Sequence, residues 1–330
     1  MSRVLITGGA GFVGLHLAQE LAARGANVDV LDSFARGVED ETVTRLVQSG
    51  DIRLIRCDLL DPAALDDLSP VYDTIFHLAA IVGVAHVRER PASVLRDNVE
   101  IHGRVLAFAA RHDPRPRLVF ASTSEVYAGT LEHYELPLPT PETTPLALTS
   151  LAEPRTTYLL SKLYGEAMCH HAEVPFSIVR PHNVYGPRMG LSHVVPELLK
   201  RAHDAPDGGQ LEVYSADHTR TFCYVGDAVE MLIRVAADPR CAGETLNLGR
   251  QRPEVSIREV AGAVLDVVGK RLEIVPLPPT PGSPERRCPD MTRMRKLTGF
   301  EARIELTTGI ERTYAWYREY VFSGTGVSAV

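Results

Sequence analysis

The chain has 330 residues, of which 45% are hydrophobic and 23% charged, and its formal net charge is −7. A chain of this length buries a large core without covalent staples, so disordered and collagen-like classes are excluded. No apolar run reaches the roughly 20 residues of a membrane span, and the acidic balance argues against a nucleic-acid surface. The composition therefore predicts a soluble globular protein, and it is compatible with a local basic pocket for one small anionic ligand.

The five cysteines lie far apart, without a C-x-x-C pair or a Cys/His spacing typical of metal sites. This pattern predicts reduced thiols and no metal site. The first residues, Met1–Arg3, run directly into the apolar segment Val4–Thr7 and do not form the pattern of a signal peptide. Both features predict a cytoplasmic protein.

In the first 180 residues, short apolar runs rich in β-branched residues alternate with amphipathic stretches. The predicted strands are Val4–Thr7, Val28–Leu31, Ile52–Arg56, Thr74–Leu78, Leu118–Ala121 and Ser177–Arg180. The predicted helices between them include Phe12–Ala23, Val94–Arg111 and Thr157–Ala172. Because parallel strands need long crossover connections, this alternation predicts an α/β fold with a Rossmann-type doubly wound parallel sheet.

After Pro181 the order changes, and helical patterns are joined by Pro- and Gly-rich segments. The predicted helices here are Pro196–His203, Asp227–Ala237, Ile257–Val268 and Thr308–Tyr320. We expect a nucleotide-binding domain over residues 1–180, with a segment near 211–250 returning to it. Residues 181–330 are expected to form a smaller, mixed substrate lobe. The small-residue tail Ser323–Val330 is predicted to be mobile.

A glycine-rich loop, Gly8–Gly14, follows the first predicted strand and opens the first predicted helix at Phe12 and Val13. Its glycines Gly8, Gly11 and Gly14 suit a tight turn, close approach to a pyrophosphate and close packing of helix on strand. The helix N-terminus adds N–H donors and a partial positive charge. The loop therefore predicts a dinucleotide site.

Asp32 ends the next predicted strand, about 20 residues further on, where a carboxylate accepts hydrogen bonds from an adenosine ribose. A carboxylate also repels a 2′-phosphate, so we expect NAD and not NADP, although Arg36 follows closely. Asp58, after the third strand, has two open interpretations. It contacts the adenine end of the cofactor, or it caps a helix that starts near Pro62.

Tyr158 and Lys162 stand four residues apart on a predicted helix and therefore share one of its faces. The ammonium group is expected to lower the pKa of the phenol and to hold the nicotinamide ribose, so that the phenolate acts as a general base. Phe120–Tyr127, with its hydroxyls, ends the fifth predicted strand at the edge where parallel sheets bind ligands. Together these segments predict an active site.

These segments, taken in order, resemble the extended short-chain dehydrogenase/reductases that modify nucleotide sugars. The resemblance spans the chain to about residue 320. The motifs that carry it are the glycine loop, Asp32, Asp58-Leu59, His77-Leu-Ala-Ala80, Ser122-Thr-Ser-Glu-Val-Tyr127, Tyr158-x-x-x-Lys162, Arg180-Pro-His-Asn183 and Tyr185-Gly-Pro187. The resemblance implies a bound NAD, a nucleotide-sugar substrate that is expected to be a UDP-sugar, and a homodimer formed by Val94–Arg111 and Thr157–Ala172.

The resemblance also assigns roles to individual residues. It implies that Tyr158 is the base, that Lys162 is its partner and that Thr123, Ser124 and Glu125 act on the sugar. The further cofactor contacts that it implies are Leu59, Leu78, Ala79, Ala80 and Asn98, the last of which an exposed surface position would explain equally well. The substrate contacts that it implies are Arg155, Asn183, His193, Arg220 and Arg287.

All such enzymes first oxidise C4 of the sugar, and the triplet Thr123-Ser124-Glu125 bears on the fate of the 4-keto sugar. Dehydratases of the family usually carry an Asp where Ser124 stands, and plain 4-epimerases often lack the Glu. The triplet, Arg155 and the Arg220-Thr-Phe222 segment resemble the UDP-glucuronate decarboxylases best. We therefore expect decarboxylation. The alternative is 4-epimerisation of a UDP-hexose or UDP-hexuronate. 4,6-Dehydration is expected less, and a non-catalytic NAD sensor least of all.

Overall fold

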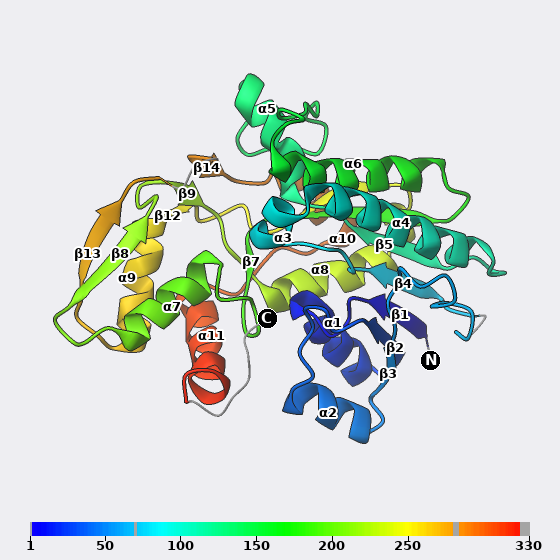
Figure 1. The fold of residues 1–330 in the computed structure, drawn as a ribbon, viewed down its shortest axis with the longest axis horizontal. Helices are drawn as coiled ribbons and strands as arrows, with labels where there is room; N and C mark the ends of the chain where they lie inside the picture. The colour runs from blue at the N-terminus through cyan, green and yellow to red at the C-terminus, as the bar shows by residue number, and fades with distance from the viewer. Residues whose placement is uncertain (1, 69–70, 280–283, 324–330) are drawn as a thin grey trace.

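The computed structural model describes residues 2–68, 71–279 and 284–323. Seven parallel strands form one sheet in the order β11-β6-β5-β4-β1-β2-β3 (Figure 1). Their bounds are β1 Arg3–Thr7, β2 Asn27–Asp32, β3 Ile52–Arg56, β4 Thr74–His77, β5 Arg117–Ala121, β6 Phe176–Pro181 and β11 Thr245–Leu248. The predicted α/β fold with a doubly wound parallel sheet is confirmed. The predicted mobile tail lies outside the described residues from position 324 onward.

Both faces of the sheet are buried, because successive side chains of a strand point to opposite faces. In β1, Val4 and Ile6 pack into one hydrophobic cluster, whereas Leu5 belongs to a second. The first cluster includes helices α1 (Phe12–Ala23) and α8 (Val225–Ala237). The second includes α4 (Pro91–Ala110) and α6 (Pro154–His171), which lie side by side across the sheet from α1 and α8 (Figure 1).

The second half of the chain adds a smaller group of elements beside the sheet (Figure 1). Strands β8 and β13 form a parallel pair, and β9 lies between β12 and β14 in a three-stranded sheet. The bounds are α7 Val194–Asp204, β8 Gln210–Tyr214, β9 Thr219–Arg220, β12 Val255–Ser256, α9 Ile257–Val268, β13 Glu273–Leu277, β14 Arg286–Arg287, α10 Thr292–Thr298 and α11 Leu306–Tyr320. These short strands are not among the elements that the sequence pattern predicts.

The chain crosses between the two groups of elements more than once. Helix α8 packs on the large sheet, and β11 extends that sheet by pairing with β6, from Thr245 beside Ile178 to Leu248 beside Pro181. Strand β8, which precedes them, pairs instead with β13. The remaining elements are α2 Glu41–Gln48, α3 Val84–Glu89, the 3-10 turn η1 Ser124–Tyr127, α5 Ala128–His133 and the 3-10 turn η2 Pro239–Cys241.

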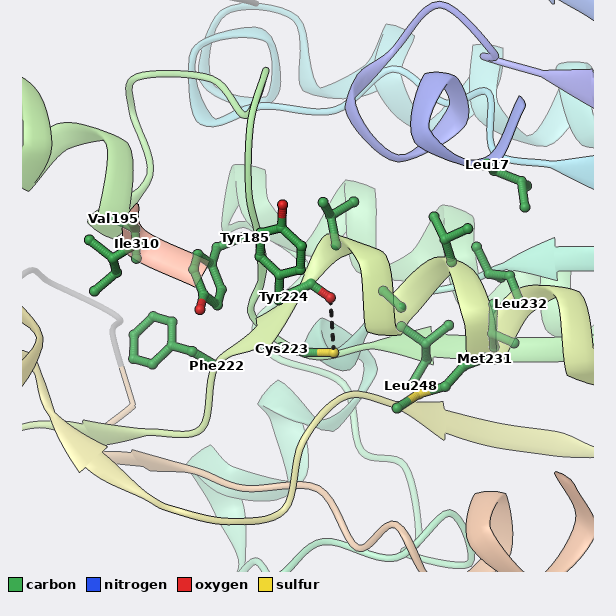
Figure 2. Packing of buried hydrophobic residues seen from close by; sticks show 14 of the residues in the cluster. Leu17, Tyr185, Val195, Phe222, Cys223, Tyr224, Met231, Leu232, Leu248 and Ile310 are labelled. Atoms are coloured by element: carbon green, nitrogen blue, oxygen red, sulfur yellow. Dashed lines mark hydrogen bonds between the residues drawn. The ribbon is translucent and has the colours of Figure 1, made fainter. Parts of the chain in front are cut away.

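Strands β7 (Val184–Tyr185) and β10 (Cys223–Tyr224) join the two groups of elements. Figure 2 shows the aromatic side chains of this region, Tyr185, Phe222 and Tyr224, gathered between α8 and the Ile310 side chain of α11. The Tyr185 ring lies edge-on to the other two, with centroid distances of 6.1 Å to Phe222 and 5.8 Å to Tyr224. This continuous core fixes the smaller group of elements against the large sheet.

Within the described residues, no helix is both long enough and apolar enough to cross a membrane. The same residues contain no group of three or more His, Cys, Asp and Glu side chains that could hold a metal ion.

Candidate active site at the carboxyl edge of the sheet

The glycine loop makes a tight turn between β1 and α1. Gly8 has a φ of +70°, and its N–H donates to the Leu31 carbonyl at 2.8 Å. A Cβ placed on Gly14 would lie 2.3 Å from the Gly8 carbonyl oxygen, so this helix residue must be glycine for the turn to close. No side chain caps α1 at Gly11. The backbone N–H groups of its first turn therefore suit the diphosphate of a dinucleotide.

Asp32 lies at the end of β2 with its carboxylate oriented by two backbone donors. Its Oδ2 accepts from Ala10 N at 2.9 Å and its Oδ1 from Phe34 N at 2.8 Å. A carboxylate oxygen has further lone pairs for ligand hydroxyls. The position suits the adenosine ribose that was predicted for it, and the group expected here is a dinucleotide without a 2′-phosphate.

These residues line a cavity of about 410 Å³ at the carboxyl ends of the strands. The predicted residues in its wall are Gly8, Gly11, Phe12, Val13, Gly14, Asp32, Arg36, Asp58, Leu59, Leu78, Ala79, Ala80 and His193. Sequence reasoning missed several others, among them Cys57, Ile81, Val82, Met189 and Gly190. The glycine cradle, the uncapped helix and Asp32 together fit NAD, so the chain's own residues match the cofactor that the sequence predicts.

Three predicted residues in or near this wall have roles that the sequence did not settle. Arg36 donates from Nη1 to the Val82 carbonyl at 3.0 Å, so it bridges the loops after β2 and β4. Asp58 accepts from Leu60 N at 2.9 Å and lines the cavity. The prediction of a helix that starts near Pro62 is wrong, because residues 62–67 form turns. His193, which was predicted to contact the sugar, lines the dinucleotide cavity instead.

Asn98 on α4 is buried, with 6% of its surface exposed, so the interpretation as an ordinary surface residue is wrong. Its Oδ1 accepts from Ile81 N at 2.7 Å and its Nδ2 donates to the Ile81 carbonyl at 3.0 Å. The same Nδ2 reaches Ser161 Oγ on α6 at 3.3 Å. Asn98 therefore fixes the loop after β4 against the helix that carries Tyr158 and Lys162, and it is absent from the cavity wall.

Tyr158 and Lys162 lie one turn apart on α6, outside the wall of the dinucleotide cavity. The Lys162 ammonium donates to the Ala121 carbonyl at 2.7 Å and lies 6.0 Å from the centre of the Tyr158 ring. Burial lowers the pKa of Lys162 to about 8. Burial, followed by the negative charge of Glu125, raises the pKa of Tyr158 to about 12. This direction is opposite to the one predicted from Lys162 alone.

The predicted triplet lies at the end of β5, close to Tyr158. Thr123 Oγ1 accepts from Glu125 N at 3.2 Å, and a hydrogen bond between the Thr123 side chain and Tyr158 partly offsets the raised pKa of the phenol. Ser124 begins η1, and its Oγ lies 3.4 Å from Arg287 Nη1. Thr123 is therefore placed to hold a sugar hydroxyl beside the phenol.

Glu125 sits between two arginines. It accepts from Arg287 Nη2 at 2.8 Å, and its other oxygen lies 3.6 Å from Arg155 Nη2. Arg287, and to a smaller extent Arg155 and Arg220, keep the pKa of Glu125 below its usual range. The carboxylate is therefore ionised at neutral pH. Two guanidinium groups contact one carboxylate here.

Asn183 and Arg220 bind backbone in the turn beside the site. Asn183 Nδ2 donates to the Thr221 carbonyl at 3.0 Å. Arg220 donates to the carbonyls of Thr219 at 2.7 Å and Glu285 at 3.0 Å, and also to the Pro284 carbonyl. Both residues thus shape the chain next to Arg287, and the charge of Arg220 also acts on Glu125.

A buried ion pair beneath the triplet was missed as a functional element by sequence reasoning. Arg180 of β6 makes two hydrogen bonds to Glu166 of α6, at 2.9 and 2.6 Å, and donates to the Tyr127 hydroxyl of η1 at 2.8 Å. Glu166 also accepts from Ser122 Oγ at 2.5 Å. The network joins β5, β6 and α6, so it fixes the Tyr158 helix relative to Glu125. A charged Arg inside an apolar strand pattern is the signal that could have indicated it.

The model of the NAD dependent epimerase/dehydratase family matches residues 4–249, a span that contains the glycine loop, the triplet and the Tyr158 helix. The chain belongs to this family. The resemblance seen in the sequence is thereby confirmed, and NAD is the cofactor. The prediction of an NAD-dependent enzyme is confirmed with it, in agreement with the dinucleotide cavity at the sheet edge.

The relatives of the chain include a decarboxylase that is similar over almost the whole length. The UDP-N-acetyl-alpha-D-glucosaminuronate decarboxylase of Bacillus cytotoxicus is 33% identical, with 96% of this chain and 98% of the relative covered. The UDP-glucuronic acid decarboxylase 4 of Arabidopsis thaliana is 32% identical, with 97% of this chain and 69% of the relative covered. Among solved structures, UDP-glucose 4-epimerase of Thermus thermophilus in complex with NAD is 27% identical, with 97% and 100% covered and a TM-score of 0.78.

Proposed function

We propose that this protein is an NAD-dependent decarboxylase of a UDP-linked hexuronate, of the UDP-glucuronate type. The observation that carries the proposal is the placement of Arg287 and Arg155 on Glu125, directly beside Thr123 and Tyr158. Two guanidinium groups beside the predicted base suit a sugar that carries a carboxylate. The two decarboxylase relatives support the same interpretation, since both are named for hexuronate substrates.

NAD would be held by the glycine loop, the first turn of α1 and Asp32. When bound, it accepts a hydride from C4 of the sugar. Tyr158 takes the proton of the C4 hydroxyl, which Thr123 orients through its own hydroxyl. Burial raises the pKa of the phenol, whereas the Thr123 hydrogen bond and the charge of Arg36 lower it, and these two groups therefore favour the proton transfer.

The oxidised sugar carries a ketone β to its carboxylate. The bond between C5 and the carboxylate carbon then breaks, CO₂ leaves, and the electron pair moves toward the ketone oxygen to give an enolate. The enolate takes a proton at C5, the hydride returns to C4, and Tyr158 gives its proton back to the C4 oxygen, so the product is a sugar that has lost only its carboxylate. Thr123 and the protonated Tyr158 face that oxygen as hydrogen-bond donors, which stabilises the charge that develops on it. Glu125 and Arg287 stand on the carboxylate side, where their own pairing keeps the arginine in position.

4-Epimerisation of a UDP-hexose or UDP-hexuronate is the second candidate. It is favoured by the likeness of the whole fold to the Thermus thermophilus 4-epimerase. Epimerisation requires the 4-ketone to turn over before it is reduced, whereas the Glu125 and Arg287 pair provides no evident help for that motion. 4,6-Dehydration is disfavoured because Ser124 has no acidic proton to give to a leaving C6 hydroxyl.

The reaction is tested by incubating the purified protein with UDP-glucuronate and, separately, with UDP-N-acetylglucosaminuronate, and then analysing the products by NMR. A sugar that has lost its C6 carboxylate, with release of CO₂, supports decarboxylation. A galacto-configured uronate supports 4-epimerisation instead. Recovery of both substrates unchanged, from protein shown to contain NAD, would overturn both candidates for these sugars.

We further propose that the protein forms a homodimer through α4 and α6 and works in the cytoplasm. The two helices pack against each other on one face of the sheet, and Tyr164 of α6 remains 55% exposed there. All five cysteines are free thiols, as expected in a reducing compartment. Light scattering coupled to size exclusion tests the dimer, and a Tyr164→Glu variant should shift the mass toward that of one chain.

A further inference from the structure

Arg188 lies in the segment Gly186–His193 between β7 and α7. Its guanidinium group is buried against the glycine loop and the loop after β2. Only 3% of its side chain is exposed. Its Nη2 donates to the carbonyls of Ala10 and Val38, each at 3.1 Å, and its Nη1 forms an ion pair with Asp40. Two loops beside the dinucleotide cavity therefore converge on one side chain.

Asp40, the ionic partner, has a second task. Its Oδ1 accepts from Val43 N at 3.0 Å and so caps the N-terminus of α2, while Oδ2 faces Arg188. The Asp40 side chain is 4% exposed, so neither charge can be satisfied by water. Removing one member of such a buried pair leaves the other unpaired, which is costly.

The contacts of Arg188 lead directly to the groups that face the cofactor. The carbonyl of Ala10 accepts from Arg188, while the N–H of the same residue donates to Asp32 at 2.9 Å. Met189 and Gly190, the next two residues, line the cavity, but Arg188 itself does not. The backbone of Arg188 has a φ of +70°, a conformation that a side chain of this size adopts only when its surroundings hold it there.

The same segment is attached on its other sides as well. The Pro187 carbonyl lies 3.1 Å from His16 Nε2 on α1, and the Met189 carbonyl accepts from the Tyr317 hydroxyl of α11. These contacts hold the backbone of the segment. Arg188 adds the connection from this segment to both the glycine loop and the loop after β2.

We propose that Arg188 is a positioning residue of the NAD site, which holds the glycine loop and the loop after β2 in their cofactor-binding arrangement through Ala10, Val38 and Asp40. It acts through these residues and does not touch the cofactor. The proposal concerns retention of NAD and stands whichever sugar reaction the protein catalyses.

The test measures the rate at which NAD leaves the holo-protein, followed by a coupled enzyme that consumes free NAD. Arg188→Met removes the donors at nearly constant length, and Asp40→Asn keeps a good helix cap while it removes the charge. Each variant should release NAD about tenfold faster or more, the size expected when charged hydrogen bonds that order a binding loop are lost. Because the two residues act as one unit, the double variant should release NAD no faster than Arg188→Met.

Val264→Ala in α9 is the matched control, since it removes buried volume far from the cavity without touching this network. If Arg188 has only a structural role, a control variant that loses as much thermal stability as Arg188→Met should release NAD just as fast as Arg188→Met. That result would overturn the proposal. Arg188→Lys keeps the charge beside Asp40 but loses the forked donors to Ala10 and Val38, and it is expected to fold. Release of NAD from Arg188→Lys at the wild-type rate would overturn the proposal too.

Discussion

Arg287 Nη2 donates to Glu125 Oε1 at 2.8 Å, although the two residues are 162 positions apart in the sequence. Arg286, the residue before Arg287, turns away from Glu125. It makes two hydrogen bonds to Glu254, at 2.9 and 2.7 Å, in a partly exposed ion pair. Strand β14 thus directs two successive arginines to opposite sides, one into the site and one toward solvent. This alternation provides a matched pair of variants.

We predict that Arg287→Met lowers kcat/KM for UDP-glucuronate by about 100-fold, the effect of removing one well-placed donor from an active site. NAD content should be unchanged, because Arg287 is absent from the wall of the dinucleotide cavity. Arg286→Met, the control, should change kcat/KM by less than about twofold, since exposed ion pairs contribute little. Equal losses in the two variants would contradict the role given to Arg287.

Tyr158→Phe should retain NAD and lose turnover by at least about 100-fold, because the phenol oxygen is the group that exchanges the proton with the sugar. Product formation by NMR and NAD content by absorbance are measured on the same preparation. Tyr134→Phe, at the end of α5 and 68% exposed, serves as the control and should keep its activity. Substantial turnover by Tyr158→Phe would refute the assigned base.

Lys162→Met should stabilise the NAD-depleted protein at pH 7. Burial lowers the pKa of Lys162 from 10.5 to about 8, so the folded state binds fewer protons than the unfolded state between those values. Keeping the ammonium charged in the fold at pH 7 thus costs up to about 3 kcal/mol, and this cost fades as the pH rises from 8 to 10.5. Urea unfolding at pH 7 and pH 10 measures the difference between variant and wild type. If the difference in free energy of unfolding between Lys162→Met and the wild type does not shrink as the pH rises, the predicted cost of burying the ammonium group is wrong.

Gly14→Ala should abolish NAD retention and destabilise the fold. The added Cβ would lie 2.3 Å from the Gly8 carbonyl oxygen and 2.7 Å from Gly9 Cα, so the glycine loop would have to move. Gly262→Ala in α9 is the matched helix substitution, because no atom beyond its chain neighbours and the backbone of its own helix lies within 4 Å of the added Cβ. It should stabilise the protein by about 0.5–1 kcal/mol. Thermal unfolding and NAD content separate the two, and normal NAD content in Gly14→Ala would contradict the packing argument.

The first half of the fold could be predicted from the sequence because its signals are local. The strand from Val4, the glycine turn and the helix from Phe12 follow one another within a short stretch, and the structure contains them in that order. The position of Asp32 about 20 residues after the glycine loop also predicted it as a residue of the dinucleotide cavity. Each of these features depends on neighbours in the chain.

Other features depend on contacts between distant residues, which one sequence does not reveal. The pairing of β8 with β13 joins short strands that lie far apart in the chain, and the burial of Asn98 depends on Ile81 and Ser161. The pKa of Tyr158 was predicted in the wrong direction because the i, i+4 spacing shows Lys162 but not the burial of the phenol or the charge of Glu125.

The pairing of β11 with β6 also has a consequence for synthesis on the ribosome. Strand β11 is made only after α7 and α8, so the large sheet of a nascent chain stays open at β6 until residue 248 has emerged. An uncovered strand edge offers its N–H and carbonyl groups to other chains. Truncation or slow translation before that point should therefore favour aggregation through β6, whereas a chain halted just after it can pair β6 with its own β11.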